Sequence, residues 1–261
     1  MTQAIGEVHE QSRGTYGSPR VHAELRERGQ RIGRNRVARL MRLAGIRARE
    51  RRRFKSTTNS KHDYPVAPNV LNREFTAQRP DEKWLADMTY VATAEGWLYL
   101  ATVLDVFSRQ IVGWAMDSVM DHGLVAKALD MALLRRQPSA DLLHHSDRGS
   151  QYAAHAYQDA LKAKGITVSM SGTGNCYDNA MMESFFATLK AECVTQVFNS
   201  RSEARSTVFE YIEVWYNRQR RHSALGYLSP AAFEQRYTQA FLSSTKPGSV
   251  QCLLPRQTTM S

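Results

Sequence analysis

The sequence of 261 residues predicts a mixed α/β domain that follows a small, basic helical module. The α/β class is predicted because three strand-like apolar runs begin at Lys83 and are followed by alternating helical and strand patterns. Charge predicts the separate module: residues 1–60 contain 15 Lys/Arg against 5 Asp/Glu, whereas the other 201 residues contain 20 of each. The net charge of +10 therefore resides in the first quarter of the chain, where a nucleic-acid contact is expected because neutralised phosphates release counterions.

Two helices joined by a tight turn are expected within the basic module. Ser18 suits the cap and Pro19 the first position of a helix that ends before Gly29. A second helix begins near Asn35, and Gly45 follows its end. The pair resembles a helix-turn-helix, although any small helical hairpin has the same periodicity. The expected DNA contacts are the arginines of the second helix and of the basic run after it: Arg36, Arg39, Arg42, Arg51, Arg52 and Arg53.

The α/β domain begins with three predicted strands. The segment WLADMTYV (84–91) alternates in the way a strand does, and the runs 97–106 and 109–117 are joined by a short turn, as in a hairpin. Asp121 then suits the cap of a helix that ends before Pro138. The remaining expected elements are a buried strand at 141–145, a helix from Tyr152 to Lys164 capped by Ser150, a strand at 166–170, the helix that bears Glu183, and a helix from Ser202 to Asn217.

These patterns divide the chain into four predicted parts. Residues 1–60 form the helix-turn-helix-like DNA-binding module, and residues 61–80 form a linker. Residues 81–236 form the α/β core with its C-terminal helices. Residues 237–261 are rich in Ser, Thr, Gln and Pro, so a flexible tail is expected there.

Composition argues against several classes of protein. No stretch approaches 18 consecutive apolar residues, and the N-terminus lacks the pattern of a signal peptide, so we expect a cytoplasmic, nucleoid-associated protein without membrane contact. The three cysteines are isolated from one another. Because no C-x-x-C accompanies the eight histidines, neither a zinc knuckle nor a disulfide framework is expected.

Three carboxylates carry the strongest chemical signal. Asp87 lies within the first strand, Asp147 follows a buried strand in HHSDRGSQY, and Glu183 lies in DNAMMESFF, with 35 residues between the last two. Carboxylates gathered at one point repel one another, and two divalent cations would remove that conflict. Oxygen ligands without clustered His or Cys favour Mg²⁺ or Mn²⁺. Two such ions are the usual apparatus for in-line displacement at a phosphodiester.

The helix that bears Glu183 has one apolar face, made by Met182, Phe185, Phe186, Leu189 and Cys193. Glu183 lies about 100° from the centre of that face, so its carboxylate should point to the edge of the sheet. Lys190 lies on the same side of the helix as Glu183, about 10 Å further along the helix axis. We expect Lys190 to contact a phosphate near the carboxylates.

Other polar residues have competing interpretations. Asp105 is a rival metal ligand, but aspartates at hairpins often accept turn amides. Asp178 suits a helix cap better than a ligand. His144 and His145 are expected to be packed and neutral. Arg148 and Asn175 are candidate DNA contacts near the carboxylates, and loop structure alone would also explain Asn175. Phosphate contact and packing are equally compatible with three late arginines: Arg218, Arg220 and Arg221.

Taken together, the motifs resemble the second-frame, catalytic half of bacterial insertion-sequence transposases of the IS-three family, within the retroviral-integrase-like DDE superfamily. The resemblance spans roughly residues 14–233 and includes the segments YGSPRVHAEL and NRVARLM of the basic module. Five further motifs occur in the family's order: W-x-x-D-x-T-Y at 84–90, D-x-x-S-R-x-I-V-G-W at 105–114, HSDRGSQY at 145–152, GNCYDNAMMESF at 174–185 and Y-N-R-Q-R-R-H at 216–222.

The resemblance implies a ribonuclease H-like core with a mixed five-stranded sheet. It implies that Asp87, Asp147 and Glu183 bind two Mg²⁺ or Mn²⁺ ions, and that Lys190 is the basic residue beyond the glutamate. The implied substrates are double-stranded DNA of the element's terminal inverted repeats and of the target, bound by a homo-multimer. Since the chain has no sustained leucine heptads, the upstream-frame protein is an expected fusion or partner.

The implied activity is that of a DDE transposase, an Mg²⁺-dependent polynucleotidyl transferase. It nicks the element's ends and joins the freed 3′ hydroxyl to another phosphodiester. Two other functions are compatible with the residues. One is a DNA-binding regulator that does no chemistry, and the other is a ribonuclease H-like nuclease that cuts without joining.

Overall fold

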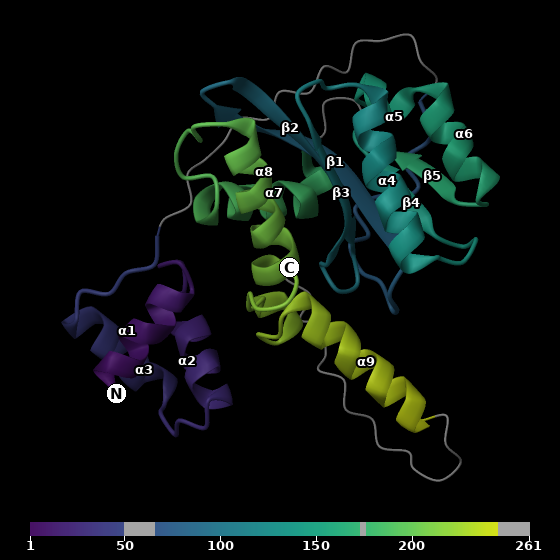
Figure 1. Cartoon of the computed structure of the whole chain (residues 1–261). Helices are drawn as coiled ribbons and strands as arrows, with labels where there is room; N and C mark the ends of the chain where they lie inside the picture. The colour runs from purple at the N-terminus through teal and green to yellow at the C-terminus, as the bar shows by residue number, and fades with distance from the viewer. Residues whose placement is uncertain (50–65, 173–175, 245–261) are drawn as a thin grey trace. The chain divides into compact units, whose positions relative to one another are not determined.

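The computed structural model describes residues 1–49, 66–172 and 176–244 (Figure 1). The chain divides into two compact units. One unit contains Met1–Arg52 together with Trp215–Ser261, and the other contains Arg53–Val214. Within the described ranges, no helix is both long and apolar enough to cross a membrane.

The unit of residues 53–214 is built on a five-stranded sheet with the order β3-β2-β1-β4-β5. Strand β1 pairs antiparallel with β2 and parallel with β4, and β4 pairs parallel with β5. The predicted mixed five-stranded sheet is therefore confirmed. The strands span Lys83–Thr93 (β1), Gly96–Asp105 (β2), Ile111–Asp117 (β3), Leu143–Ser146 (β4) and Thr167–Met170 (β5).

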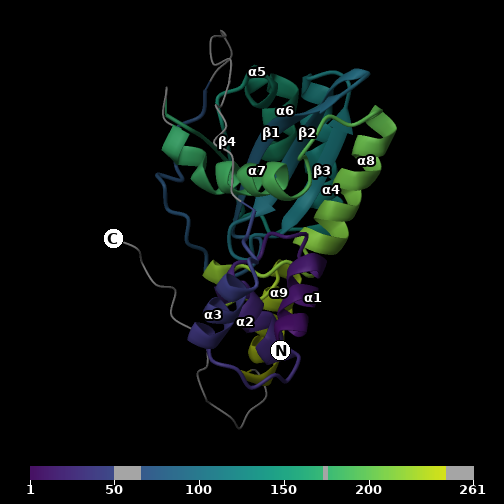
Figure 2. The same cartoon turned by 90° about the vertical axis from the view of Figure 1, so that its left-hand side faces the viewer.

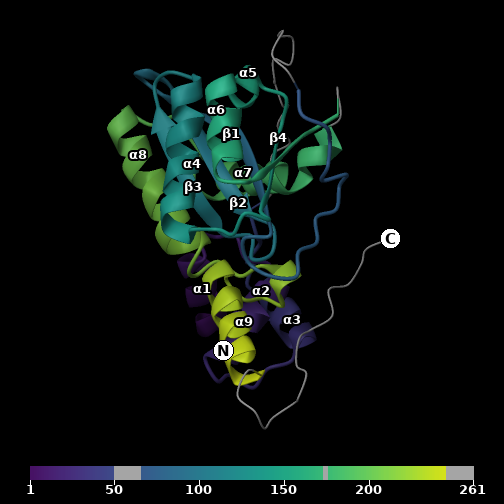
Figure 3. The same ribbon diagram turned by 90° about the vertical axis from the view of Figure 1, so that its right-hand side faces the viewer.

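Helices cover both faces of this sheet. Helix α4 (His122–Arg136) and helix α6 (His155–Ala163) lie on one side, and helix α7 (Ala180–Glu192) lies on the other (Figures 2 and 3). Asp121 caps α4 by accepting the Leu124 N–H at 3.0 Å, as predicted. Gly113 lets α4 approach β3, because a Cβ there would lie only 2.2 Å from the Ala128 carbonyl oxygen.

Two predicted helices differ from the structure in detail. The helix expected from Tyr152 to Lys164 is two helices, α5 (Ser150–Ala153) and α6, because Ala154 between them has an extended backbone with ψ of 133°. Its N-cap is Gly149, so the predicted cap at Ser150 is wrong. The helix predicted from Ser202 to Asn217 begins as α8 (Arg201–Glu210), capped by Ser200, and continues as a π-helix over Tyr211–Tyr216.

Residues 66–80, predicted to be linker, are packed on the core. The Ser169 hydroxyl accepts the N–H groups of Val70 and Leu71 at 2.9 and 3.1 Å. The Arg73 guanidinium forms an ion pair with Asp178 at 2.9 Å. This segment therefore belongs to the core, whereas residues 61–65 lie outside the described residues.

The other unit contains three N-terminal helices and a C-terminal segment. Helices α2 (Ser18–Glu27) and α3 (Arg34–Leu43) confirm the predicted pair. The predicted cap at Ser18 is wrong, because Gly17 is the N-cap of α2. Helix α1 (Thr2–Gln11) was not predicted, because only Ile5 and Val8 are buried in it and its apolar pattern is short. The three helices share a small core of Ile5, Val8, Val21, Leu25, Val37 and Met41.

The C-terminal boundary of the core differs from the predicted one at 236. Residues from Trp215 onward cluster with α1–α3 instead of with the sheet. The contacts that place them there are made by side chains almost 200 residues apart, such as Arg221 with Glu24 at 2.7 Å. Helix α9 (Pro230–Ser244) also extends into the predicted tail, of which residues 245–261 lie outside the described part.

Candidate active site

Asp87 and Asp147 lie side by side because of the register of two parallel strands. The last residue pair between β1 and β4 is Ala86 with Ser146. Asp87 directly follows Ala86, and Asp147 directly follows Ser146. Neighbouring strands lie about 5 Å apart, so both side chains leave the sheet at the same point. Both aspartates are partly exposed.

Electrostatics agree with that proximity. Burial raises the pKa of Asp87 well above its ordinary value, and the negative charge of Asp147 raises it further. The Met88 N–H, which Asp87 accepts at 2.7 Å, opposes this effect. The charge of Glu183 raises the pKa less, and the Asn179 amide slightly lowers it. The two negative charges therefore repel each other, and binding of a proton or a cation would reduce that repulsion.

Glu183 lies in the first turn of α7, beside the buried face that holds the helix on the sheet. Its side chain is exposed, and partial burial raises the pKa of its carboxyl. Across the described ranges, no three His, Cys, Asp or Glu side chains are gathered closely enough to hold a metal ion. The structure thus brings Asp87 and Asp147 together. The charge of Glu183 acts on Asp87, but the Glu183 carboxylate does not join the pair in one cluster.

The loop after Asp147 depends on a glycine. The Gly149 N–H donates to Asp147 Oδ1 at 2.9 Å, and a Cβ at Gly149 would lie 3.0 Å from the same oxygen. The neighbouring Arg148 donates from Nε to the Ser171 carbonyl oxygen, which ties the ends of β4 and β5 together. Arg148 therefore has a structural contact in addition to its predicted role in binding DNA.

Lys190 lies two turns beyond Glu183 and is half-buried. Burial lowers the pKa of its ammonium group, and the charge of Asp87 opposes that shift. The ammonium nitrogen lies 4.7 Å from the centre of the Tyr90 ring. Tyr90 packs edge-on against Trp97, and these side chains are 40% and 49% exposed. The sequence prediction missed this aromatic pair, although both residues lie at outward positions of adjoining strands.

Two other acidic residues are satisfied by the protein. Asp105, the rival ligand, accepts the Ser108 N–H and hydroxyl at 2.8 and 2.9 Å and the Asp81 N–H at 2.7 Å. This confirms that Asp105 supports the hairpin turn. Asp178 accepts Arg73, the Gly172 N–H at 2.8 Å and the Asn69 amide at 3.0 Å. The prediction that Asp178 caps α7 is wrong, because it holds residues 66–73 against the core.

The two histidines before Asp147 are buried and neutral, as predicted. Burial lowers the pKa of His144 to about 3 and that of His145 to about 4. His144 is hydrogen-bonded to the Tyr157 hydroxyl at 3.0 Å, and His145 contacts the hydroxyls of Ser169 and Ser171 at 2.8 and 3.2 Å. Neither imidazole is needed as a metal ligand, so the donor set at the site consists of carboxylate oxygens and fits a hard divalent cation.

In the other unit, the predicted DNA-contacting face is exposed. Val37 and Met41 turn one side of α3 into the small core, and the opposite side carries Arg36, Arg39 and Arg42, all exposed. A surface of this kind suits phosphate contact. The other predicted contacts lie outside the described residues: Arg51, Arg52, Arg53 and Asn175.

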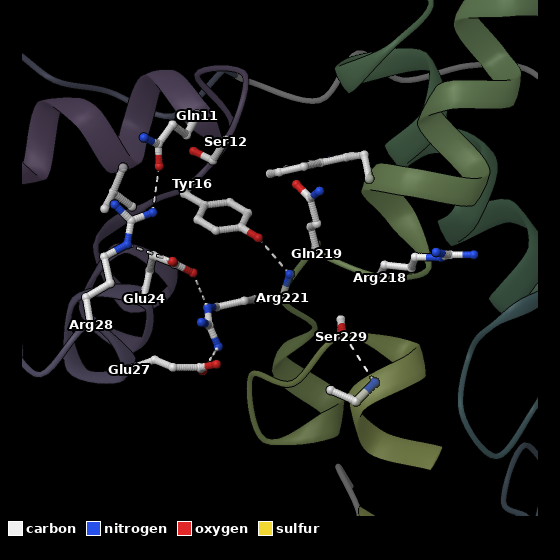
Figure 4. Close-up of a pocket in the computed structure, with 13 residues that line it drawn as sticks. Gln11, Ser12, Tyr16, Glu24, Glu27, Arg28, Arg218, Gln219, Arg221 and Ser229 are labelled. Atoms are coloured by element: carbon white, nitrogen blue, oxygen red, sulfur yellow. Dashed lines mark hydrogen bonds and ion pairs between the residues drawn. The ribbon is translucent and has the colours of Figure 1, made fainter. Parts of the chain in front are cut away.

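A pocket of about 370 Å³ in this unit contains an ionic cluster (Figure 4). The Arg221 guanidinium pairs with Glu24 at 2.7 Å and with Glu27 at 2.8 Å, and the Arg221 backbone N–H donates to the Tyr16 hydroxyl at 2.6 Å. Arg220 and Arg221 are only 2% and 8% exposed. Phosphate contact is therefore the wrong interpretation for these two arginines, which pack within the protein.

Comparison with known proteins agrees with the geometry. Residues 77–176 and 164–230 match integrase core domains, and residues 1–54 match an HTH-like domain. The chain is 53% identical over 233 residues to the insertion element IS600 uncharacterized 31 kDa protein of Shigella sonnei, covering 89% of this chain and 86% of that protein. It is 46% identical over 226 residues to the transposase InsF for insertion sequence IS3A of Escherichia coli, covering 86% and 78%.

The fold is also similar to that of a retroviral protein. A chain of the simian T-cell lymphotropic virus intasome, solved in complex with the PP2A regulatory subunit B56 gamma, aligns with a TM-score of 0.52 at 12% identity. The alignment covers 98% of this chain and 80% of that one. At this identity the likeness concerns the fold alone, whereas identities of 46–53% over most of the chain establish kinship. The chain therefore belongs to the IS3 family of insertion-element transposases, with an integrase core domain and an HTH-like domain.

Proposed function

We propose that the protein is a DDE transposase that cleaves DNA at the ends of its insertion sequence and joins the freed 3′ hydroxyl to target DNA. The observation that carries this proposal is the Asp87–Asp147 pair, where the pairing of β1 with β4 ends, within an integrase core. Membership of the transposase family supports the same reaction. The proposed substrates are terminal-repeat and target duplexes, bound by a multimer of this chain.

The proposed cofactor is a pair of Mg²⁺ or Mn²⁺ ions held by Asp87, Asp147 and Glu183. When bound, such ions activate the attacking water or hydroxyl and stabilise the leaving oxygen. Asp87 and Asp147 supply the fixed part of the site because the sheet positions them. Glu183 supplies the adjustable part, since its exposed side chain has rotamer freedom and is drawn to the pair by the cation charge.

Three groups of residues are proposed to hold the DNA. Lys190 contacts a phosphate next to the scissile bond, where its charge lies close enough to interact with Asp87. Tyr90 and Trp97 present exposed rings on which an unpaired base can stack. Residues of the basic module contact phosphates further along the duplex: Arg36, Arg39 and Arg42.

The test compares Glu183→Gln with the unmodified protein in cleavage and strand-transfer assays with Mg²⁺ and terminal-repeat DNA. We expect product formation to fall by about 10³-fold or more, since metal catalysis supplies several kcal/mol. DNA affinity in a gel shift should stay within about twofold, because the substitution preserves size and removes no cation. Asp130→Asn, on the exposed side of α4, is the matched control and should retain activity.

Three outcomes would contradict the proposal in different ways. Undiminished activity of Glu183→Gln would remove Glu183 from the site. An unmodified protein that binds the repeats but never cuts them would be a regulator. An unmodified protein that cuts without forming joined products would be a nuclease.

A further inference from the structure

Buried polar atoms without a partner concentrate next to the carboxylate pair. Among the described residues, the buried side-chain atoms that lack a hydrogen-bond partner are His144 Nδ1, Tyr152 Oη and both amide atoms of Asn179. Proteins satisfy nearly all such groups, because an unpaired buried donor has lost its water without replacement. Three of the four atoms belong to Tyr152 and Asn179. The charges of Asp87 and Asp147 raise the pKa of Tyr152, and the Asn179 amide lowers the pKa of Asp87.

Tyr152 approaches the pair from the core. It lies in α5, five residues after Asp147, and its side chain is 1% exposed. Its ring packs edge-on against Tyr157 with the ring centres 5.5 Å apart. Burial raises the pKa of the Tyr152 hydroxyl, and the nearby Tyr157, Asp87 and Asp147 raise it further. The hydroxyl therefore keeps its proton and lies in the field of both carboxylates as a potential donor.

Asn179 approaches the pair from the start of α7. It occupies the N-cap position but makes no side-chain capping bond to the residues the structure describes. Its side chain is 5% exposed, so the amide is directed inward. The amide lies beside Asp87 and favours the charged form of that carboxyl. Because Asn179 precedes Glu183 by one helical turn, it links the helix that carries Glu183 to the aspartate pair.

We propose that Tyr152 and Asn179 are positioning residues that donate hydrogen bonds to Asp87 and Asp147 when the pair holds a divalent cation. The inference depends on the proposed function. A carboxylate that gives one oxygen to a cation leaves its other oxygen to accept a hydrogen bond, and such donors orient metal ligands. Each donor is buried, lacks a partner among the described residues and interacts electrostatically with the carboxylates.

The first test uses Tyr152→Phe, which removes the hydroxyl and keeps the ring. The metal-free protein should be as stable as the unmodified one or more stable, because an unsatisfied buried group is removed. The affinity for Mn²⁺ should fall by about 10-fold or more, as is typical when such a donor is lost. Calorimetric titration and the Mn²⁺-induced rise in Tm measure both quantities in the full chain, with and without terminal-repeat DNA.

Tyr157→Phe is the matched control. It removes the hydroxyl of a neighbouring buried tyrosine that is hydrogen-bonded to His144. We expect the opposite result: lower stability without metal and an unchanged response to Mn²⁺. A purely structural role for Tyr152 would make the two variants behave alike.

Asn179→Ala tests the second donor in the same way. It should weaken Mn²⁺ binding, whereas Asn69→Ala should not, because the Asn69 amide donates to Asp178 and not to Asp87 or Asp147. An intact Mn²⁺ response in both Tyr152→Phe and Asn179→Ala would overturn the inference. If Asp87→Asn still abolished that response, the metal site of the proposed function would stand. If the unmodified protein itself failed to respond to Mn²⁺, the metal site and the inference would both fall.

Discussion

Two acidic pairs, one in each unit of the molecule, have opposite electrostatic environments. Glu24 and Glu27 lie around Arg221, and the hydrogen bonds from Arg221 and Arg28 outweigh burial, so the pKa of Glu24 is lowered. Asp87 lies next to Asp147, forms no ion pair with any residue in the described ranges, and has its pKa raised. Burial acts in the same direction on Glu24 and Asp87, so the neighbouring charge decides the outcome.

The comparison separates carboxylates that stabilise the protein from carboxylates available for chemistry. Asp105 and Asp178 resemble Glu24, because backbone N–H groups or arginines satisfy them. Only at the junction of β1 and β4 does the described structure leave like charges adjacent and donors unpaired. A raised pKa next to unsatisfied donors therefore indicates the site better than acidity alone.

Breaking the paired cluster should have the largest effect on stability. Arg221→Ala leaves Glu24, which is 22% exposed, without its partner, and losing one member of a buried pair costs about 3 kcal/mol. Glu27 is 65% exposed, so its ion pair should add less than about 1 kcal/mol. Thermal unfolding of the full chain should show a lower transition for the unit of α1–α3. Arg218→Ala, in the same pocket but outside the ion pairs that Figure 4 draws, is the control and should change stability by less than about 0.5 kcal/mol. Equal effects of the two substitutions would show that the cluster does not stabilise this unit.

The buried histidines should make the core sensitive to acid. The pKa of His145 is lowered from 6.5 to about 4, so the stability from its neutral form is present above pH 6.5 and is lost as the pH falls towards 4. Between pH 7.5 and 5 the free energy of unfolding should drop by about 2 kcal/mol for this group. Denaturant unfolding at several pH values measures the slope. His145→Gln should flatten that slope, and an unchanged slope would place the acid sensitivity elsewhere.

Relieving the like-charge pair should have the smallest effect and the opposite sign. Asp87→Asn removes one of two adjacent negative charges, so the metal-free protein at pH 7 should gain about 1 kcal/mol. Mg²⁺ should stabilise the unmodified protein and not the variant. Asp105→Asn is the control, and it should destabilise the protein because Asp105 accepts three hydrogen bonds. A loss of stability in Asp87→Asn would contradict the difference between the two acidic pairs.

The sequence predicted most elements of the core because their signals are local. Alternation in β1, the cap at Asp121 and the apolar face of the Glu183 helix each depend on residues within a few positions. The motifs around Asp87, Asp147 and Glu183 carried the family resemblance, which the comparisons confirm. Helix α1 and the break at Ala154 were missed because neither leaves a clear local pattern.

Only the tertiary structure decided which charged groups meet. Arg73 reaches Asp178 and Arg221 reaches Glu24 across 105 and 197 residues, and no spacing in the sequence indicates either pair. The register of β1 with β4 likewise decides that Asp87 and Asp147 adjoin, while Glu183 stays apart on α7. Periodicity and caps are short-range properties that a sequence displays directly. Partners, burial and the resulting pKa shifts depend on long-range packing, so they exist only once the chain has folded.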